Sequence, residues 1–279
     1  MSVTDHRTEG AIRAAELQAE IAATALESNP FVTGLAVFGA YFRFVGEVIR
    51  GLPHIRHQFR EFLDQAWFIS SVTIIPSILM AIPFCVIIVF DTNQLLSEIG
   101  AVDLAGAGAG LAVIREIGPV ASVLVVAGAG ATAVCADLGS RKIREELDAM
   151  VALGINPVHR LVVPRVLASA LVSVCLNGLI CVTGLVGGYF FSVYSSGVTP
   201  GLYISGLTVL VGPADFVMSE LKAVVFGLIA GTIACYLGMN AKGGPRGVGN
   251  AVNQTVVFTF MALFFANSVM TAVFLKIQG

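Results

Sequence analysis

The sequence predicts an all-α integral membrane protein with an N-terminal amphipathic interfacial helix and five transmembrane helices. The first observation is composition, since 56% of the 279 residues are hydrophobic and only 12% are charged, against roughly 25% charged in a soluble domain. The second is that several stretches lack charge for about 20 residues, the length that crosses a bilayer core of roughly 30 Å. The third is a strongly charged segment, 137–165, with apolar segments on both sides.

The first 66 residues are expected to lie outside the membrane core. Residues 1–30 are polar and Ala-rich, with no apolar region typical of a signal peptide, and form either a docking helix or a partly disordered tail. Residues 31–66 place aromatic side chains on one helical face and arginines on the other, which suits a helix in the headgroup plane. Trp67 follows as an interface anchor, and the membrane body is expected over 67–279.

The first span is expected at residues 67–90 and contains Pro76 and Pro83. Prolines inside a span are tolerated where neighbouring helices or a cavity satisfy the freed carbonyl groups. This span is therefore expected to line a cavity, and a plain packing kink is the alternative.

The second apolar stretch, 104–136, is too long for one straight crossing. Arg115-Glu116 and Gly118-Pro119 interrupt it, so we expect a short lead-in helix, a break and then the span. The remaining spans are expected at 166–193, 216–238 and 251–275. Closely spaced glycines permit close helix packing, and the expected packing positions are Gly128, Gly130, Gly184, Gly188, Gly227 and Gly231.

The positions of lysine and arginine predict the orientation. Residues 1–66, 137–165 and 239–250 carry six, five and two of the sixteen Lys and Arg residues, whereas the loops 91–103 and 194–215 carry none. By the positive-inside rule, the three basic segments face the cytoplasm. Five spans then place the N-terminus in the cytoplasm and the C-terminus outside.

The charged segment is expected to hold one helix, 140–154, which ends at Gly154, a natural C-cap. Its bases come before its acids, an order that opposes the helix macrodipole and gives the weaker orientation of i,i+4 pairs. Either the bases lie in anionic headgroups, or the acids face a protein partner, which we favour. The bases are Arg141, Lys142 and Arg144, and the acids are Glu145, Glu146 and Asp148.

The sequence shows no motif for nucleotide binding, metal binding or nucleophilic catalysis. GxxxxGK[ST] is absent, and Lys242 precedes its neighbouring glycines instead of following them. The five cysteines lack CxxC spacing and are expected to be small core side chains. We expect no catalytic, cofactor-binding or metal-binding residue and no nucleic acid partner, so energy for any work comes from elsewhere.

Residues 114–168 read IREIGPVASVLVVAGAGATAVCADLGSRKIREELDAMVALGINPVHRLVVPRVLA. This run closely resembles the MlaE/YrbE family of permeases, the membrane subunits of ABC-type lipid transporters that work with MCE-domain proteins. The order of motifs matches over roughly residues 31–275. The stretches FREFLDQAWF (59–68), IREELDAM (143–150) and KGGPRGVGNAVN (242–253) look like the actinobacterial YrbE branch, of the A type.

The resemblance implies roles for individual residues. The helix over 140–154 would be a coupling helix that inserts into a groove of a cytoplasmic ATPase. Arg115 and Glu116 match the family's Arg-Glu-Leu/Ile-Gly-Pro element and are expected at a lipid cavity or subunit interface, with internal ion pairing as the alternative. The expected ATPase-coupling residues are Glu145, Glu146, Asp148, Met150, Leu153 and Gly154, and the expected cavity or interface residues are Arg115, Glu116, Pro119, Pro76 and Pro83.

The resemblance also implies partners and a location. It implies an ATPase dimer that binds ATP and Mg, MCE-domain proteins on the outer side and a lipid substrate, all at the inner (cytoplasmic) membrane. Many family members have an arginine in the glycine motif of the second span, where this chain has Ala127-Gly128-Ala129-Gly130. We therefore expect a heterodimer with a related, non-identical YrbE subunit.

The expected function is that of a permease subunit that moves hydrophobic lipids between the inner membrane and an MCE-protein tunnel, without an enzymatic site of its own. The alternative is an ion-coupled secondary transporter or channel that uses Arg115 and Glu116. Such transporters are often built from inverted repeats, and this chain shows no convincing internal repeat.

Overall fold

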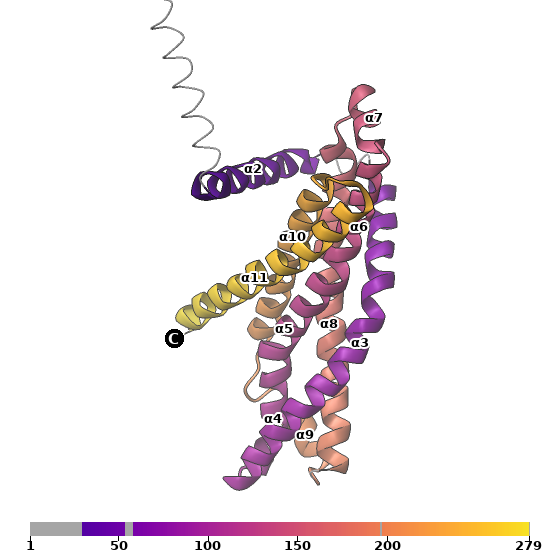
Figure 1. The fold of residues 1–279 in the computed structure, drawn as a ribbon. Coiled ribbons are helices and arrows are strands. Elements are labelled where there is room, and N and C mark those ends of the chain that lie inside the picture. Colours follow the sequence, from indigo (N-terminus) through magenta and orange to yellow (C-terminus); the bar gives the residue numbers. More distant parts are fainter. Residues whose placement is uncertain (1–29, 54–57, 196, 279) are drawn as a thin grey trace, which may run out of the picture. The chain divides into compact units, whose positions relative to one another are not determined.

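All regular elements are helices within residues 30–53, 58–195 and 197–278, which a computed structural model describes (Figure 1). Five helical runs in this part of the chain are long and apolar enough to cross a membrane. The predicted all-α integral membrane fold with five spans is therefore confirmed. The expectation for residues 1–29 lies outside the described residues. The five runs are Phe59–Glu98, Val102–Ile143, Val158–Tyr194, Pro213–Met239 and Gly244–Lys276.

The amphipathic segment expected as one element over 31–66 is divided in two. Helix α2 runs from Pro30 to Gly51, and its residues up to Ile49 belong to a compact unit separate from the rest of the chain. Phe38, Phe42 and Ile49 are exposed on it. Helix α3 begins at Phe59 and continues without a break into the first span, ending at Glu98. Because Pro53 has no N–H to continue the helical ladder, α2 ends before it.

Helix α3 packs on α8 (Val163–Tyr194) through a narrow stripe of small side chains. Its buried residues recur at every fourth position, which places them on one face, and small side chains allow the two helices to approach closely. Asn93 Nδ2 donates to Ser192 Oγ at 2.8 Å and joins the two helices near their far ends. The buried residues of α3 are Gln65, Ile69, Thr73, Ser77, Ala81, Cys85, Val89 and Asn93.

The second span is one helical run of changing pitch, so the expected break in residues 104–136 is wrong. Gly118 and Pro119 begin α5 instead of ending a helix. A π-helical segment directly precedes them, and a wider turn accommodates a proline that cannot join the regular ladder. The run consists of η2 (Val102–Leu104), α4 (Ala105–Gly110), π-helical η3 (Leu111–Ile117), α5 (Gly118–Val125), π-helical η4 (Val126–Ala131) and α6 (Thr132–Ile143).

The remaining elements complete the bundle. Short helix α7 (Glu146–Ala152) follows α6, and π-helical η5 (Val158–Val162) leads into α8. Helix α9 (Pro200–Gly206) precedes the last two spans, α10 (Pro213–Met239) and α11 (Gly244–Gln278). Helix α7 lies at one end of the bundle, and α4 and α9 lie at the other (Figure 1).

Helix α9 is held at its end of the bundle by a buried tyrosine. Tyr203 is 1% exposed, and its hydroxyl donates to the carbonyl oxygen of Leu185 at 3.2 Å. Burial raises the pKa of Tyr203 to about 12, so this hydroxyl remains a donor at neutral pH. A Cβ on Gly106 would collide with the carbonyl oxygen of Tyr203, which explains why glycine occupies that position of α4.

The predicted packing glycines differ in their surroundings. A Cβ on Gly227 would lie 2.5 Å from the Cα of Ala170, and one on Gly231 would lie 3.1 Å from the Cα of Val166, so α10 meets α8 almost backbone to backbone. Gly184 and Gly188 face side chains of α3, and Gly130 faces Thr73 at 3.5 Å. In contrast, a Cβ on Gly128 would meet nothing within 4 Å, so the expected packing role is not seen there.

Gly227→Ala is expected to destabilise the protein by about 1–3 kcal/mol, the usual cost of overpacking. The atoms that the new methyl group meets are the backbone of Ser169 and Ala170, which cannot move aside as a side chain does. Thermal unfolding in detergent measures this as a lower apparent Tm. The matched control is Gly128→Ala, which we expect to leave Tm unchanged or to raise it, because alanine favours helix by about 1 kcal/mol. Equal losses in both variants would contradict this packing account.

Candidate functional site

The charged segment forms a helical hairpin and not the single helix expected over residues 140–154. Helix α6 ends at Ile143, Arg144 and Glu145 form a turn, and α7 begins at Glu146. Glu145 has φ of 60° and is the one non-glycine residue with positive φ in the described part of the chain. Gly154 follows α7 with φ of +75°, and Ile155 N–H donates to the carbonyl oxygen of Met150 at 2.9 Å. This is the glycine helix stop that was expected.

The hairpin reverses the meaning of the charge order. Arg141 and Lys142 lie in the last turn of α6, and Glu146 and Asp148 lie in the first turn of α7. Bases at a helix C-terminus and acids at a helix N-terminus both complement the macrodipole. The order that is unfavourable in one helix is favourable in two, so the charge order gives no reason to assign the acids to a partner.

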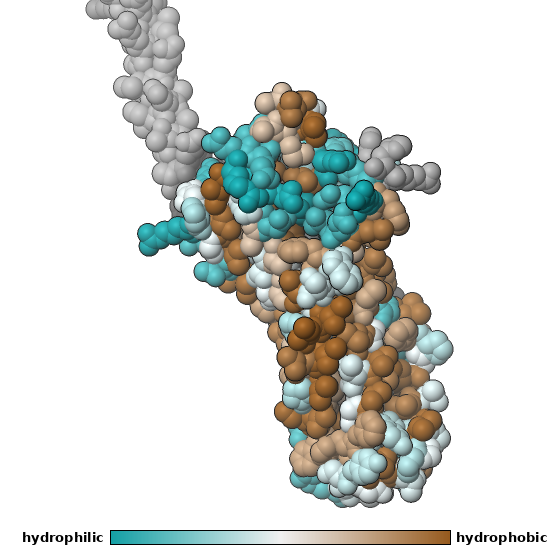
Figure 2. All heavy atoms as spheres, turned by 90° about the vertical axis from the view of Figure 1, so that its right-hand side faces the viewer, coloured by the Kyte–Doolittle hydropathy of each residue, from teal (hydrophilic) through white to brown (hydrophobic). Residues whose placement is uncertain are grey.

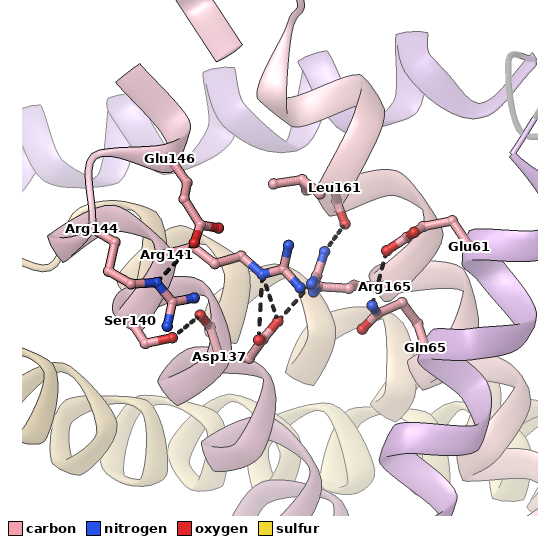
Figure 3. Close-up of polar contacts among 9 residues, drawn as sticks. All are labelled: Glu61, Gln65, Asp137, Ser140, Arg141, Arg144, Glu146, Leu161 and Arg165. Atoms are coloured by element: carbon pink, nitrogen blue, oxygen red, sulfur yellow. Dashed lines mark hydrogen bonds and ion pairs between the residues drawn. The ribbon is translucent and has the colours of Figure 1, made fainter. Parts of the chain in front are cut away.

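Exposed ion pairs join the two arms of the hairpin. Lys142 Nζ of α6 lies 2.8 Å from Asp148 Oδ1 of α7. Arg144 Nε, in the turn, lies 2.8 Å from Glu146 Oε1 (Figure 3). Pairs with this exposure contribute at most about 1 kcal/mol each. The buried side chain of Leu147 anchors α7 between them.

An ion pair between a buried arginine and a partly exposed aspartate joins the foot of the hairpin to α8. Arg165 is fully buried, and its Nη2 lies 2.6 Å from Asp137 Oδ2 on α6 (Figure 3). Its Nη1 donates to the carbonyl oxygen of Leu161 at 2.9 Å, and Arg141 also reaches Asp137, at 3.4 Å. Sequence reasoning gave this pair no role. The available signal was that Asp137 and Arg165 have opposite charge and bound the segment at its first and last residues.

The C-terminal end of α7 and the residues directly after it are apolar and exposed. The side chains of Val151 and Leu153 are 60% and 77% exposed, and Ile155 is 43% exposed. We call these three residues the hairpin tip. Figure 2 shows apolar atoms at this end above a broad hydrophilic belt. Of the expected coupling residues, Leu153 belongs to the tip, and Met150 is half-buried. Glu145 lies in the turn before α7, and Glu146 and Asp148 lie in the first turn of α7.

The expected intramembrane site at Arg115 and Glu116 has a different partner. Arg115 lies in η3 and its Nε donates to Asp215 Oδ1 of α10 at 3.1 Å, while Gly212 N–H donates to Asp215 Oδ2 at 3.0 Å. The guanidinium carbon of Arg115 lies 5.9 Å from the ring centre of Phe274. Glu116 is exposed. Arg115 therefore forms an internal ion pair, which was the alternative expectation. Its partner is Asp215, which was not among the residues expected from sequence.

The expected cavity residues do not share one enclosed space in the described structure. Pro76 and Pro83 lie on the exposed face of α3, and Pro119 is buried in α5. A void between α3, η4, α8 and α10, with Gly130 and Gly231 in its wall, has a volume of about 10 Å³. That is room for roughly one water molecule and not for a lipid.

Comparison with known proteins connects these features to a family. Residues 62–273 match the family described as Permease MlaE. A probable ABC transporter permease protein of Rickettsia prowazekii (strain Madrid E) is 32% identical over 167 residues, covering 60% of this chain and 64% of the relative. A second probable ABC transporter permease protein, from Synechocystis sp. (strain ATCC 27184 / PCC 6803 / Kazusa), is 33% identical over 168 residues and is also covered to 64%, by 60% of this chain. The chain thus spans 64% of the length of these relatives. The chloroplastic protein Trigalactosyldiacylglycerol 1 of Arabidopsis thaliana is 26% identical over 280 residues, covering 100% of this chain and 79% of the relative. This chain belongs to the MlaE permease family.

Proposed function

We propose that this chain is the membrane subunit of an ABC-type lipid transporter and that a separate ATPase drives it through the hairpin of α6 and α7. The observation that carries the proposal is an exposed apolar hairpin tip on an ion-paired base. An apolar surface rimmed by polar residues is typical of a protein interaction site. The sequence has no P-loop of its own, and relatives are named as ABC transporter permeases.

The arrangement of charged segments supports a cytoplasmic hairpin. Val248, in the basic turn, would lie 3.1 Å from a Cβ on Gly139 of α6, so two basic segments meet at one end of the bundle. The loops without lysine or arginine flank α4 and α9 at the opposite end (Figure 1). Under the positive-inside rule, the hairpin end faces the cytoplasm.

A force on the hairpin tip would reach the spans by two routes. Helix α6 continues directly into η4 and η3, and π-helical segments in a helix often mark functional sites. The pair of Asp137 and Arg165 links α6 to α8 at the foot of the hairpin. We propose that α6 and α8 move together, so that closure of the ATPase changes the membrane part of the transporter.

The substrate and the other partners follow from the open faces of the bundle. Spans α3 and α11 are the least covered of the five, and the void beside Gly130 and Gly231 is too small for a lipid. We propose that a lipid passage forms between this chain and a second, non-identical YrbE-type permease. MCE-domain proteins would receive or deliver the lipid at the end of the bundle that holds α9, in a transporter of the inner membrane.

Val151→Asp tests the ATPase part of the proposal. A carboxylate on the hairpin tip is expected to reduce co-purification of the ATPase at least about tenfold, because burying one charge against an apolar groove costs more than the 1.4 kcal/mol that corresponds to tenfold. The matched control is Val209→Asp, since Val209 is 61% exposed, like Val151 at 60%, and follows α9 at the other end. Equal recovery of the ATPase with both variants would refute the role of the hairpin tip.

A further inference from the structure

A polar cluster lies inside the membrane-spanning parts of α5, α8 and α10, away from the hairpin. Asn177 of α8 is fully buried at its centre. Its Nδ2 donates to Ser219 Oγ at 2.9 Å and to Glu220 Oε1 at 3.2 Å. Its Oδ1 accepts a hydrogen bond from Ser122 Oγ at 3.2 Å. Glu220 is the one ionisable side chain of this cluster.

The two carboxyl oxygens of Glu220 have unequal surroundings. Oε1 accepts the bond from Asn177, whereas Oε2 is shielded from solvent and has no hydrogen-bond partner in the described part of the chain. Glu220 forms no ion pair among the described residues. A Cβ on Gly178 would lie 3.6 Å from Oε1, so the backbone of α8 closes over this oxygen.

Among the residues that the structure describes, no cation forms an ion pair that would compensate a charge on Glu220. Lys222 lies two residues further along α10, on a different face of the helix, and donates to Thr271 Oγ1 of α11 at 2.8 Å. On η3, Arg115 is paired with Asp215, and Glu116 is an acid. On α8 the nearby titratable group is the thiol of Cys181. The sequence of α5 has no titratable residue, and α11 has only Arg246 and Lys276, near its two ends.

Helix α10 therefore carries two acids in contrasting environments. Asp215 faces the guanidinium of Arg115 and the N–H of Gly212, so a negative charge on it is compensated. Glu220 is partly exposed, but its Oε2 is shielded from solvent, and among the described residues it has one amide donor and no ion-pair partner. An uncompensated carboxylate in an apolar medium takes up a proton instead of remaining charged.

We propose that Glu220 is a proton-binding site and is a neutral carboxylic acid in the folded membrane protein. The carbonyl oxygen of the neutral acid is Oε1, which matches the donor from Asn177, and the proton resides on Oε2. Loss of this proton would place a lone charge between α8 and α10. A proton on Glu220 thus favours the contact between α10 and α8. Helix α8 is the helix that Arg165 joins to the hairpin.

Infrared difference spectroscopy of the purified complex at neutral pH tests the proposal. The wild type is expected to show the carbonyl stretch of a protonated carboxyl group, and Glu220→Gln, a neutral replacement of the same shape, is expected to lack it. The matched control, Asp215→Asn, is expected to keep the band, because Asp215 is paired with Arg115 in the wild type. Absence of the band from the wild type, or its persistence in Glu220→Gln, would overturn the proposal.

If Glu220→Gln does not fold, labelling of the wild type with dicyclohexylcarbodiimide tests whether Glu220 is protonated. A protonated carboxyl adds across a C=N bond of this apolar reagent, its proton passes to nitrogen, and the adduct rearranges to a stable N-acylurea without a leaving group. In the wild-type complex we expect peptide mass spectrometry to find the label on Glu220 and not on Asp215. A label on Asp215 alone, or equal labelling of both acids, would contradict the assignment.

Discussion

Asp137→Ala is expected to destabilise the protein by about 3–5 kcal/mol, the usual cost of leaving a buried charge without its partner. Arg165 is fully buried and lies 2.6 Å from Asp137, so the substitution leaves a guanidinium without its carboxylate. Its Nε already has no hydrogen-bond partner in the described chain. Thermal unfolding of the detergent-purified chain measures the loss as a lower apparent Tm.

Asp148→Ala is the matched control for this prediction. It removes the same side chain from an ion pair of similar length, since Lys142 Nζ lies 2.8 Å from Asp148, but the Asp148 side chain is 61% exposed. Because water screens this pair, its loss is expected to cost at most about 1 kcal/mol. Similar shifts of Tm in the two variants would show that the foot of the hairpin has no special stabilising role.

Arg115→Ala is expected to have the second largest effect, again about 3 kcal/mol or more. The Asp215 side chain is 5% exposed and would lose its cation while it remains inside the membrane part of the fold. The double variant Arg115→Ala/Asp215→Ala removes both charges and is expected to recover part of the loss, as buried pairs replaced together often do. Apparent Tm and the yield of folded protein report both effects.

The adjacent acid provides the control for the Arg115 prediction. Glu116 is exposed, whereas Arg115 is paired with Asp215. Glu116→Ala is therefore expected to change Tm little. If Glu116→Ala were as damaging as Arg115→Ala, the ion pair anticipated between these neighbours in the sequence would account for the site better than the pair with Asp215.

The spans could be predicted from sequence because the length and composition of an apolar run are local properties. The ion pairs could not, because Asp137 and Arg165 are 28 residues apart, and Arg115 and Asp215 are 100 residues apart. The sequence around two opposite charges does not show which acid pairs with which base. Only the folded bundle, in which α6 and α8 both pack on α10 and η3 also packs on α10, brings each pair together.

The hairpin shows a signal that was present but interpreted incorrectly. Bases followed by acids are the pattern expected where one helix ends and the next begins. The two helices could therefore be predicted from the charge order alone, without predicting the left-handed conformation of Glu145. The turn itself is hard to predict, because glutamate rarely adopts positive φ and Glu145 has no local sequence feature that favours it. Spacing likewise identified Gly227 and Gly128 equally, although only Gly227 faces another backbone.

Photo-crosslinking from the hairpin tip tests the central claim most directly. A photoreactive phenylalanine at position 153 replaces Leu153, which is 77% exposed, in the full chain expressed with its native partners. Illumination in membranes is expected to yield one protein adduct, identified by mass spectrometry as an ABC-type ATPase, and the same probe at Val209 is expected not to yield it. A tip that crosslinks only to lipid, or an ATPase adduct that forms equally from Val209, would contradict the account.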